Sequence, residues 1–138
     1  MVSYGFIDGF YYKPRVDKEL LKKYHKGLIA SSACLAGAVA RDILTVSYEK
    51  AKQTALEYQE IFGKDNYYLE LQDHNLKDQK KVNEALRKIH QQTGIPMICS
   101  NDSHYIYKED NVPHDILLCI QTNKTIHDEN RMRYEGGQ

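Results

Sequence analysis

Short apolar runs alternate with segments of helical periodicity along this chain, and the alternation limits the folds that it can adopt. The predicted strands cover residues 28–31, 67–74 and 97–99. Helical segments with apolar residues every three or four positions follow them, at residues 47–62, 75–93 and after Pro113. Strands separated by helices form parallel sheets with right-handed crossover connections. We therefore predict an α/β fold with parallel strands and flanking helices, over residues 1–138 as one domain or part of one.

Residues that favour helix ends predict where the helices begin and stop. Asp17 and Asn75 are predicted N-caps because their side chains can accept hydrogen bonds from the first turn. The predicted stops are Gly27, Gly63, Gly94 and Asn123. The segments predicted to be irregular are residues 5–15, 31–37 and 105–110.

Composition excludes several classes of protein. The 41% apolar and 28% charged residues are ordinary values for a soluble globular protein. No apolar run approaches the roughly 20 residues of a membrane span, and the first residues lack a secretion signal, so we expect a cytoplasmic protein without a membrane partner. The chain has three cysteines and its first residues show no secretion signal, which indicates that the thiols are reduced. The net charge of +0 provides no general electrostatic attraction to nucleic acid, although a local patch is compatible with it.

Potential metal ligands follow each predicted strand. Cys34, His74 and the pair Asp102 and His104 lie where the three strands end, and functional residues of parallel α/β proteins gather beyond the carboxyl ends of strands. Alternation along an extended chain points residues i and i+2 to the same side, so Asp102 and His104 could meet one cation. A mixed set of thiolate, carboxylate and imidazole suits zinc, manganese or iron.

The candidate metal ligands also have simpler interpretations. An Asp-x-His at a strand end is more often a turn acid beside an incidental histidine, and a free cysteine such as Cys34 is most commonly a small buried apolar residue. Cys119 is predicted to pack in the interior. The remaining histidines are predicted to be solvated on the surface: His25, His90, His114 and His127. The 11 tyrosines could stack on bases, but we predict them to be residues of the core edge.

Six motifs together resemble one family. They are residues 9–17 (GFYYKPRVD), 27–37 (GLIASSACLAG), 68–74 (YLELQDH), 82–86 (VNEAL), 101–105 (NDSHY) and 114–122 (HDILLCIQT). The combination is similar to the polymerase and histidinol phosphatase (PHP) domain of the bacterial DNA polymerase III alpha subunit, over nearly the whole chain. Two departures lie beside Cys34: Ala33 stands where the family usually has glycine, and Ala38 where it usually has glutamate.

The resemblance implies a fold and a set of site residues. The family's domain is a distorted, TIM-like β/α barrel that holds up to three metal ions at the carboxyl ends of its strands. Cys34 falls at a ligand position, Asp102 and His104 at the closing, catalytic pair of ligands, and His74 on the rim beside them. The family's opening His-x-His strand has no counterpart here, so we expect a partial PHP domain over residues 1–138 without the polymerase palm.

The same resemblance implies the function of a larger protein. The chain would be a fragment of a replicative, DNA-directed DNA polymerase, which uses magnesium and works with DNA and with other polymerase III holoenzyme subunits. Its PHP domain would hydrolyse phosphoesters, as in 3′–5′ exonuclease proofreading. The alternatives are a structural platform that supports the polymerase core or docks a proofreading subunit, and a stand-alone PHP phosphatase. We expect the isolated fragment to be inactive.

Overall fold

A small parallel sheet with three helices on one face forms the centre of the protein. In the computed structural model, which describes residues 1–134, the strands are β1 (Ala30–Ser31), β2 (Tyr67–Leu71) and β3 (Met97–Cys99), side by side in the order β1-β2-β3. Both pairs are parallel, with Ala30 opposite Tyr67 and Leu69 opposite Met97. The prediction of an α/β fold with neighbouring parallel strands is therefore confirmed.

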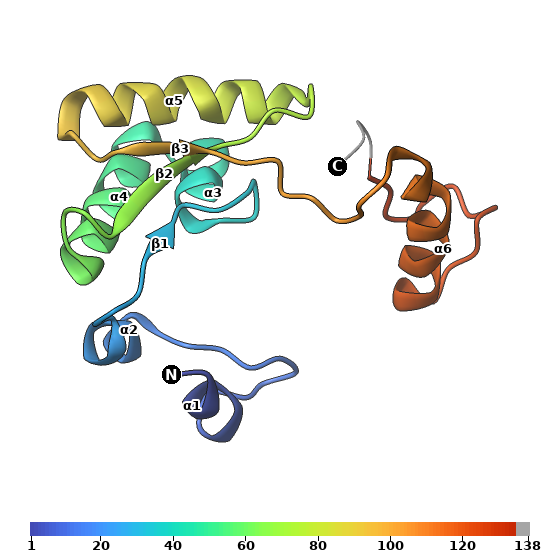
Figure 1. Ribbon diagram of the computed structural model, residues 1–138, viewed down its shortest axis with the longest axis horizontal. Coiled ribbons are helices and arrows are strands. Elements are labelled where there is room, and N and C mark those ends of the chain that lie inside the picture. Colours follow the sequence, from blue (N-terminus) through green and yellow to red (C-terminus); the bar gives the residue numbers. More distant parts are fainter. Residues whose placement is uncertain (135–138) are drawn as a thin grey trace.

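Helices connect the strands and extend the chain at both ends (Figure 1). The elements besides the strands are α1 (Val2–Ile7), α2 (Lys18–Tyr24), α3 (Ala38–Thr45), α4 (Tyr48–Phe62), α5 (Lys77–Thr93), a 3-10 helix (Lys108–Asp110) and α6 (Asn111–Thr122). α3 and α4 lie between β1 and β2 in sequence, and α5 lies between β2 and β3. None of the described helices is long and apolar enough to cross a membrane.

The core lies between one face of the sheet and the helices α3, α4 and α5. These three helices contact one another, and α4 and α5 also contact β2, so they share a face of the sheet. Tyr67 and Leu69 point into this core at 1% and 0% exposure, and the alternate residue Glu70 points to the opposite face. The other core residues are Val39, Ala40, Ile43, Ala51, Ala55, Val82, Leu86, Ile89 and Ile95.

The predicted helix boundaries are largely correct because their caps form. The Asp17 side chain accepts a hydrogen bond from the Leu20 amide at 2.8 Å, and Ser47 caps α4 in the same way. Gly94 ends α5 with a left-handed φ of 73°, and Asn123 ends α6 with φ of 53°. Local hydrogen-bonding chemistry thus determines these boundaries.

Several predictions are wrong. Residues 5–15 are not wholly irregular, because α1 covers their first part, and α3 was missed. Asn75 does not cap α5: the N-cap is Leu76, and Asn75 itself has a left-handed φ of 61°. β2 ends at Leu71, three residues earlier than predicted, and β1 begins at Ala30 rather than at Leu28.

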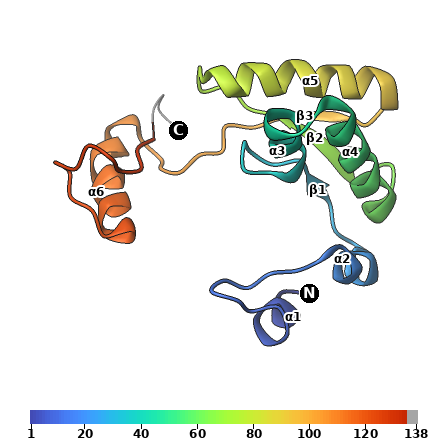
Figure 2. The same cartoon turned by 180° about the vertical axis from the view of Figure 1, so that it is seen from behind.

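The terminal segments lie apart from the sheet. Figure 2 shows the region of α1 and α2 on one side of the sheet and α6 on another, with an extended segment joining β3 to α6. Cys119 is buried, as predicted. Tyr11 and Tyr12 are 62% and 84% exposed, so the prediction that the tyrosines lie at the core edge is wrong for this pair.

Candidate functional site

Cys34 and Asp102 border the same hollow beyond the carboxyl ends of the strands. The hollow has a volume of about 370 Å³ and is also lined by Gln72, Gln79 and Tyr134. Cys34 is half-buried in the loop after β1, and Asp102 is exposed on the segment after β3. Cys34 and Asp102 come together because parallel pairing places the carboxyl ends of β1 and β3 at one edge of the sheet.

His74 is held by hydrogen bonds on both ring nitrogens. Its Nε2 lies 2.6 Å from the Asn101 carbonyl oxygen, which can only accept, so Nε2 carries the proton. Nδ1 then accepts from the side-chain amide of Gln79 at 2.8 Å, and the oxygen of that amide accepts from the His74 backbone at 2.7 Å. His74 therefore connects the end of β2 to α5 and to the segment after β3, and neither nitrogen is available to a metal in this arrangement.

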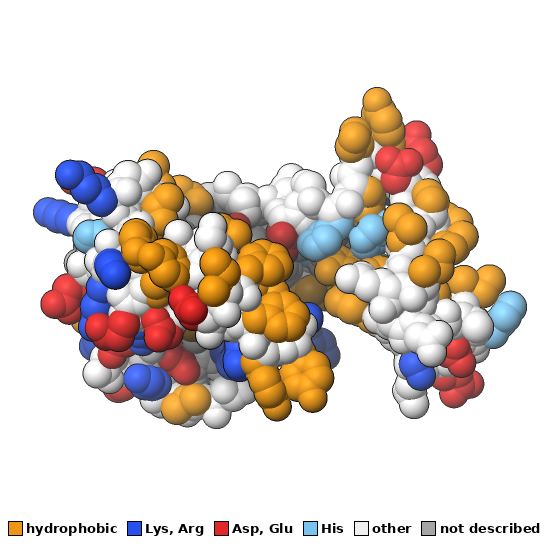
Figure 3. Space-filling view, turned by 90° about the horizontal axis from the view of Figure 1, so that it is seen from below, with side chains coloured by type: hydrophobic (Ala, Val, Ile, Leu, Met, Phe, Trp, Pro, Cys, Tyr) orange, Lys and Arg blue, Asp and Glu red, His pale blue; other side chains and the backbone are white. Residues whose placement is uncertain are grey.

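His104 belongs to an aromatic cluster near α6 that adjoins the hollow through Tyr134. Its Nε2 lies 3.1 Å from the Tyr134 hydroxyl, and the centroids of the two rings are 4.4 Å apart. His114 packs beside both, with ring centroids 5.9 Å from His104 and 5.1 Å from Tyr134. Figure 3 shows histidine side chains gathered where the main body meets the α6 region. The prediction that His114 is a solvated surface residue is wrong.

The geometric premise for pairing Asp102 with His104 is also wrong. β3 ends at Cys99, and Asp102 has a left-handed φ of 47°, so the alternation of an extended strand does not reach these residues. Instead, Asp102 lines the hollow with Cys34, and His104 lies against Tyr134.

Two other histidines proved to be structural. His25 Nδ1 lies 2.7 Å from the carbonyl oxygen of Ile61, and His90 Nδ1 lies 2.7 Å from that of Ile95. Both are half-buried, so the prediction that they are solvated is wrong, whereas His127 is exposed as predicted.

The residues present do not by themselves fit a metal centre. Within residues 1–134, no three His, Cys, Asp or Glu side chains form a group that could hold a metal ion. The hollow offers a thiol and a carboxylate, while a structural zinc takes about four ligands. The metal-ligand roles of Cys34, His74, Asp102 and His104 stay predictions.

A polar network crosses the uncovered face of the sheet, and sequence reasoning missed it. The Glu70 carboxylate on β2 accepts hydrogen bonds from the Ser31 hydroxyl on β1, the Ser100 hydroxyl after β3, and the Gln72 amide at 2.9 Å. Burial raises the pKa of Glu70, but the three hydrogen bonds outweigh it and hold that pKa below its usual value. The sequence signal was a pair of polar residues two positions apart, Glu70 on β2 and Gln72 just after it.

A partly buried ion pair supports the region around α6. Both terminal nitrogens of Arg131 donate to the carboxylate of Asp115, one of them at 2.7 Å to Oδ2, and the Arg131 side chain is only 7% exposed. The guanidinium lowers the pKa of Asp115. The pair fixes the polypeptide that carries Tyr134 against α6, which in turn positions the ring beside His104.

Comparisons with known proteins agree on one family. The PHP domain profile matches residues 1–74. The chain is 46% identical to a DNA polymerase III subunit alpha from Borreliella burgdorferi over 98% of this chain and 12% of that protein. It is likewise 46% identical to the subunit from Deinococcus radiodurans (96% and 10%) and 45% identical to that from Treponema pallidum (96% and 11%). The chain thus spans about a tenth of the length of the curated relatives that it matches.

Proposed function

The chain belongs to the PHP domain family, and from that premise we propose that it forms part of the PHP domain of a DNA polymerase III alpha subunit. The observation that carries the proposal is an identity of 46% that extends over 98% of the chain. Through the larger protein, the partners would be DNA and other subunits of the polymerase III holoenzyme. The work of this segment would be structural: to support the polymerase core.

The architecture supports a place in a β/α barrel. Parallel sheets are normally covered on both faces or closed into a barrel, and here helices cover only one face. The opposite face carries Ser31, Glu70 and Gln72, whose mutual hydrogen bonding suits the interior of a barrel better than an apolar interface. We propose that β1 to β3 are neighbouring strands of a distorted, TIM-like barrel.

A chimera tests the assignment to the polymerase. The corresponding segment of the Borreliella burgdorferi subunit alpha is replaced by this chain, and primer extension with magnesium is measured together with the melting temperature. We expect a folded chimera that extends primers, and no extension by the 138-residue chain alone. An unfolded or inactive chimera would contradict the proposal, provided that a second chimera with the Treponema pallidum segment is active.

A second candidate function is metal-dependent phosphoester hydrolysis, such as 3′–5′ exonuclease activity. The observation that favours it is that Cys34 and Asp102 line one hollow. Two side chains are fewer than the roughly four ligands of a zinc site, so the larger protein would have to supply the others. In this chain, the contribution of Cys34 and Asp102 would be to supply a thiolate and a carboxylate at one edge of the sheet.

Metal content separates the two functions in the active chimera. Cys34→Ser and Asp102→Asn are introduced together, and bound zinc, manganese and iron are measured by elemental analysis beside exonuclease and polymerase activity. Loss of metal and exonuclease activity with polymerisation retained would support hydrolysis. Unchanged metal content would leave the hollow without a metal role, and the structural function would stand alone.

A further inference from the structure

The loop at residues 10–15, hereafter the aromatic loop, exposes three consecutive aromatic side chains. Phe10, Tyr11 and Tyr12 are 58%, 62% and 84% exposed, and Lys13 and Arg15 follow them. Aromatic rings of this size bury about 150–250 Å² each when they are covered, so leaving three in water is unfavourable. Figure 3, which views the molecule from the side of α1 and α2, shows hydrophobic side chains gathered on this face.

The backbone holds the aromatic loop in one shape. The Arg15 amide donates to the Gly9 carbonyl at 3.2 Å, and the Tyr11 amide donates to the Lys13 carbonyl at 3.1 Å. A side chain at Gly9 is excluded, since its Cβ would lie 2.0 Å from the carbonyl oxygen of Arg15. Tyr12 has a left-handed φ of 59°, which a bulky residue rarely adopts, and strained residues of this kind cluster at functional sites.

Positive charge accompanies the rings. Residues 1–26 contain six Lys and Arg against three Asp and Glu, a net charge of +3 in a chain whose total is +0. The Arg15 guanidinium lies over the Tyr11 ring, 4.9 Å from its centroid. Within residues 1–134, neither Lys13 nor Arg15 forms an ion pair. Both cations are therefore available to an anion that approaches the rings.

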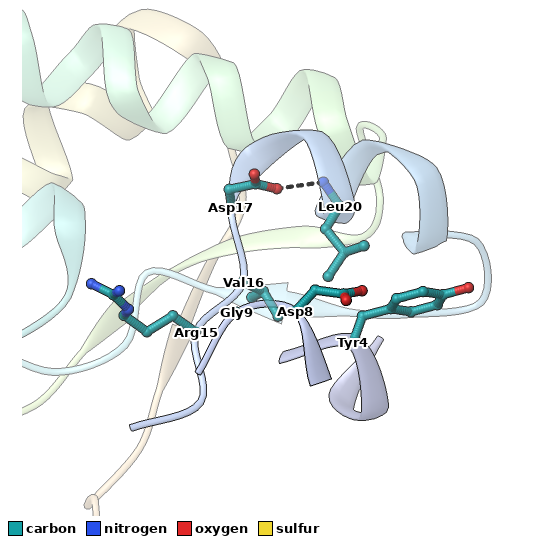
Figure 4. A pocket seen from close by; sticks show the side chains of 7 residues that line it. All are labelled: Tyr4, Asp8, Gly9, Arg15, Val16, Asp17 and Leu20. Atoms are coloured by element: carbon teal, nitrogen blue, oxygen red, sulfur yellow. Dashed lines mark hydrogen bonds between the residues drawn. The ribbon is translucent and has the colours of Figure 1, made fainter. Parts of the chain in front are cut away.

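The carboxylates nearest to the aromatic loop in the sequence are those of Asp8 and Asp17. A hollow of about 440 Å³ between α1 and α2 is lined by Tyr4, Asp8, Arg15 and Asp17, and Figure 4 shows the Arg15 side chain extending away from Asp8 and Tyr4. Asp17 is engaged as the cap of α2. Two carboxylates make the hollow a poor site for an anion although Arg15 borders it, whereas the three rings of the aromatic loop adjoin Lys13 and Arg15 in the sequence.

We propose that the aromatic loop binds single-stranded nucleic acid. Exposed rings next to cations are the combination that such strands require, because each base stacks on a ring while Lys or Arg contacts the phosphates. A duplex has its base faces covered, so it can use only the cations. The proposal goes beyond the assignment to a polymerase and does not depend on it, because it rests only on this loop.

Fluorescence anisotropy with the 138-residue chain tests the proposal. The probes are a labelled 12-nucleotide oligothymidylate and a labelled 12-base-pair duplex. We expect dissociation constants of roughly 10–100 µM for the single strand at low salt. If Lys13 and Arg15 are the only phosphate contacts, log K should fall with log salt with a slope of about −1.4.

Tyr12→Asn is the decisive variant, because asparagine tolerates the left-handed conformation and lacks the ring. We expect roughly tenfold weaker binding of the single strand. The matched control is Tyr107→Ala, which removes a 64% exposed tyrosine far along the chain and should leave binding unchanged. Circular dichroism and melting establish that both variants are folded.

Each other outcome overturns the proposal. It would be wrong if the chain failed to bind the oligothymidylate at low salt, if duplex bound as tightly as single strand, or if both tyrosine variants weakened binding equally. The rings would then serve a protein contact. A failed polymerase chimera has no bearing on this measurement, so the two hypotheses fail separately.

Discussion

Replacing Glu70 by glutamine should destabilise the protein in a way that depends on pH. The carboxylate lies on the central strand β2. It accepts hydrogen bonds from Ser31 on β1 and from Ser100, the residue after β3, and so connects the three strands. Hydrogen bonds to a charged group contribute about 1.5–3 kcal/mol each and neutral ones about 0.5–1.5 kcal/mol. In Glu70→Gln, each of the three hydrogen bonds changes from a charged to a neutral one and loses the difference between these two values. The loss is reduced because the side chain is half-exposed and solvent screens the charge. We therefore expect a loss of about 1–2 kcal/mol at pH 7.

The sign of the pH dependence follows from the lowered pKa of Glu70. A carboxyl whose pKa is lower in the folded state stabilises the protein above its unfolded pKa, here about 4.5. That contribution disappears as the pH falls through the folded pKa. The difference in free energy of unfolding between the wild type and Glu70→Gln should therefore be largest at pH 7 and should decrease toward zero as the pH falls to 3.

Urea unfolding followed by circular dichroism between pH 7 and pH 3 measures this difference. The control is Glu84→Gln, because Glu84 is exposed on α5 and has no hydrogen bond or ion pair in the part of the chain that the structure describes. A difference for Glu70→Gln that stayed constant down to pH 3, or that matched the control, would refute the role of the charge.

Three further substitutions have expected outcomes in the same unfolding assay. Ala33 has a left-handed φ of 59°, so Ala33→Gly should stabilise by about 0.5–1 kcal/mol, while Ala36→Gly in the same loop should not. Gly37→Ala should destabilise by about 1–3 kcal/mol, since its Cβ would lie 2.2 Å from the Ser32 carbonyl oxygen; full stability would exclude this close approach. Burial raises the pKa of Tyr67, and within residues 1–134 its hydroxyl has no hydrogen-bond partner, so Tyr67→Phe should be neutral or stabilise by about 1 kcal/mol, and a clear loss would reveal a hidden hydrogen bond.

The parts of the fold that the sequence predicted correctly are those determined by local chemistry. α2 and α4 begin at side chains that bind the first-turn amides, and β2 consists of β-forming residues with alternating burial. α3 was missed because it has only eight residues and follows a turn of small residues without a side-chain cap. Such a helix depends on tertiary packing of Val39 and Ile43 rather than on a local signal.

The candidate site was predictable only up to the last paired residue of each strand. Cys34, His74 and Asp102 each lie three positions beyond a strand end, at Ser31, Leu71 and Cys99 respectively. Because the strands are parallel, their carboxyl ends lie at one edge of the sheet, and the sequence was sufficient to predict this.

Beyond each strand end, a residue with left-handed φ redirects the chain. Ala33 precedes Cys34, Asn75 follows His74, and Asp102 is itself such a residue. Side-chain direction after a left-handed residue no longer follows the two-residue alternation of a strand, so no spacing rule could place these side chains relative to one another. The resemblance to the PHP domain led us to expect glycine at position 33, and the left-handed φ of Ala33 is a backbone conformation that glycine adopts more readily than alanine.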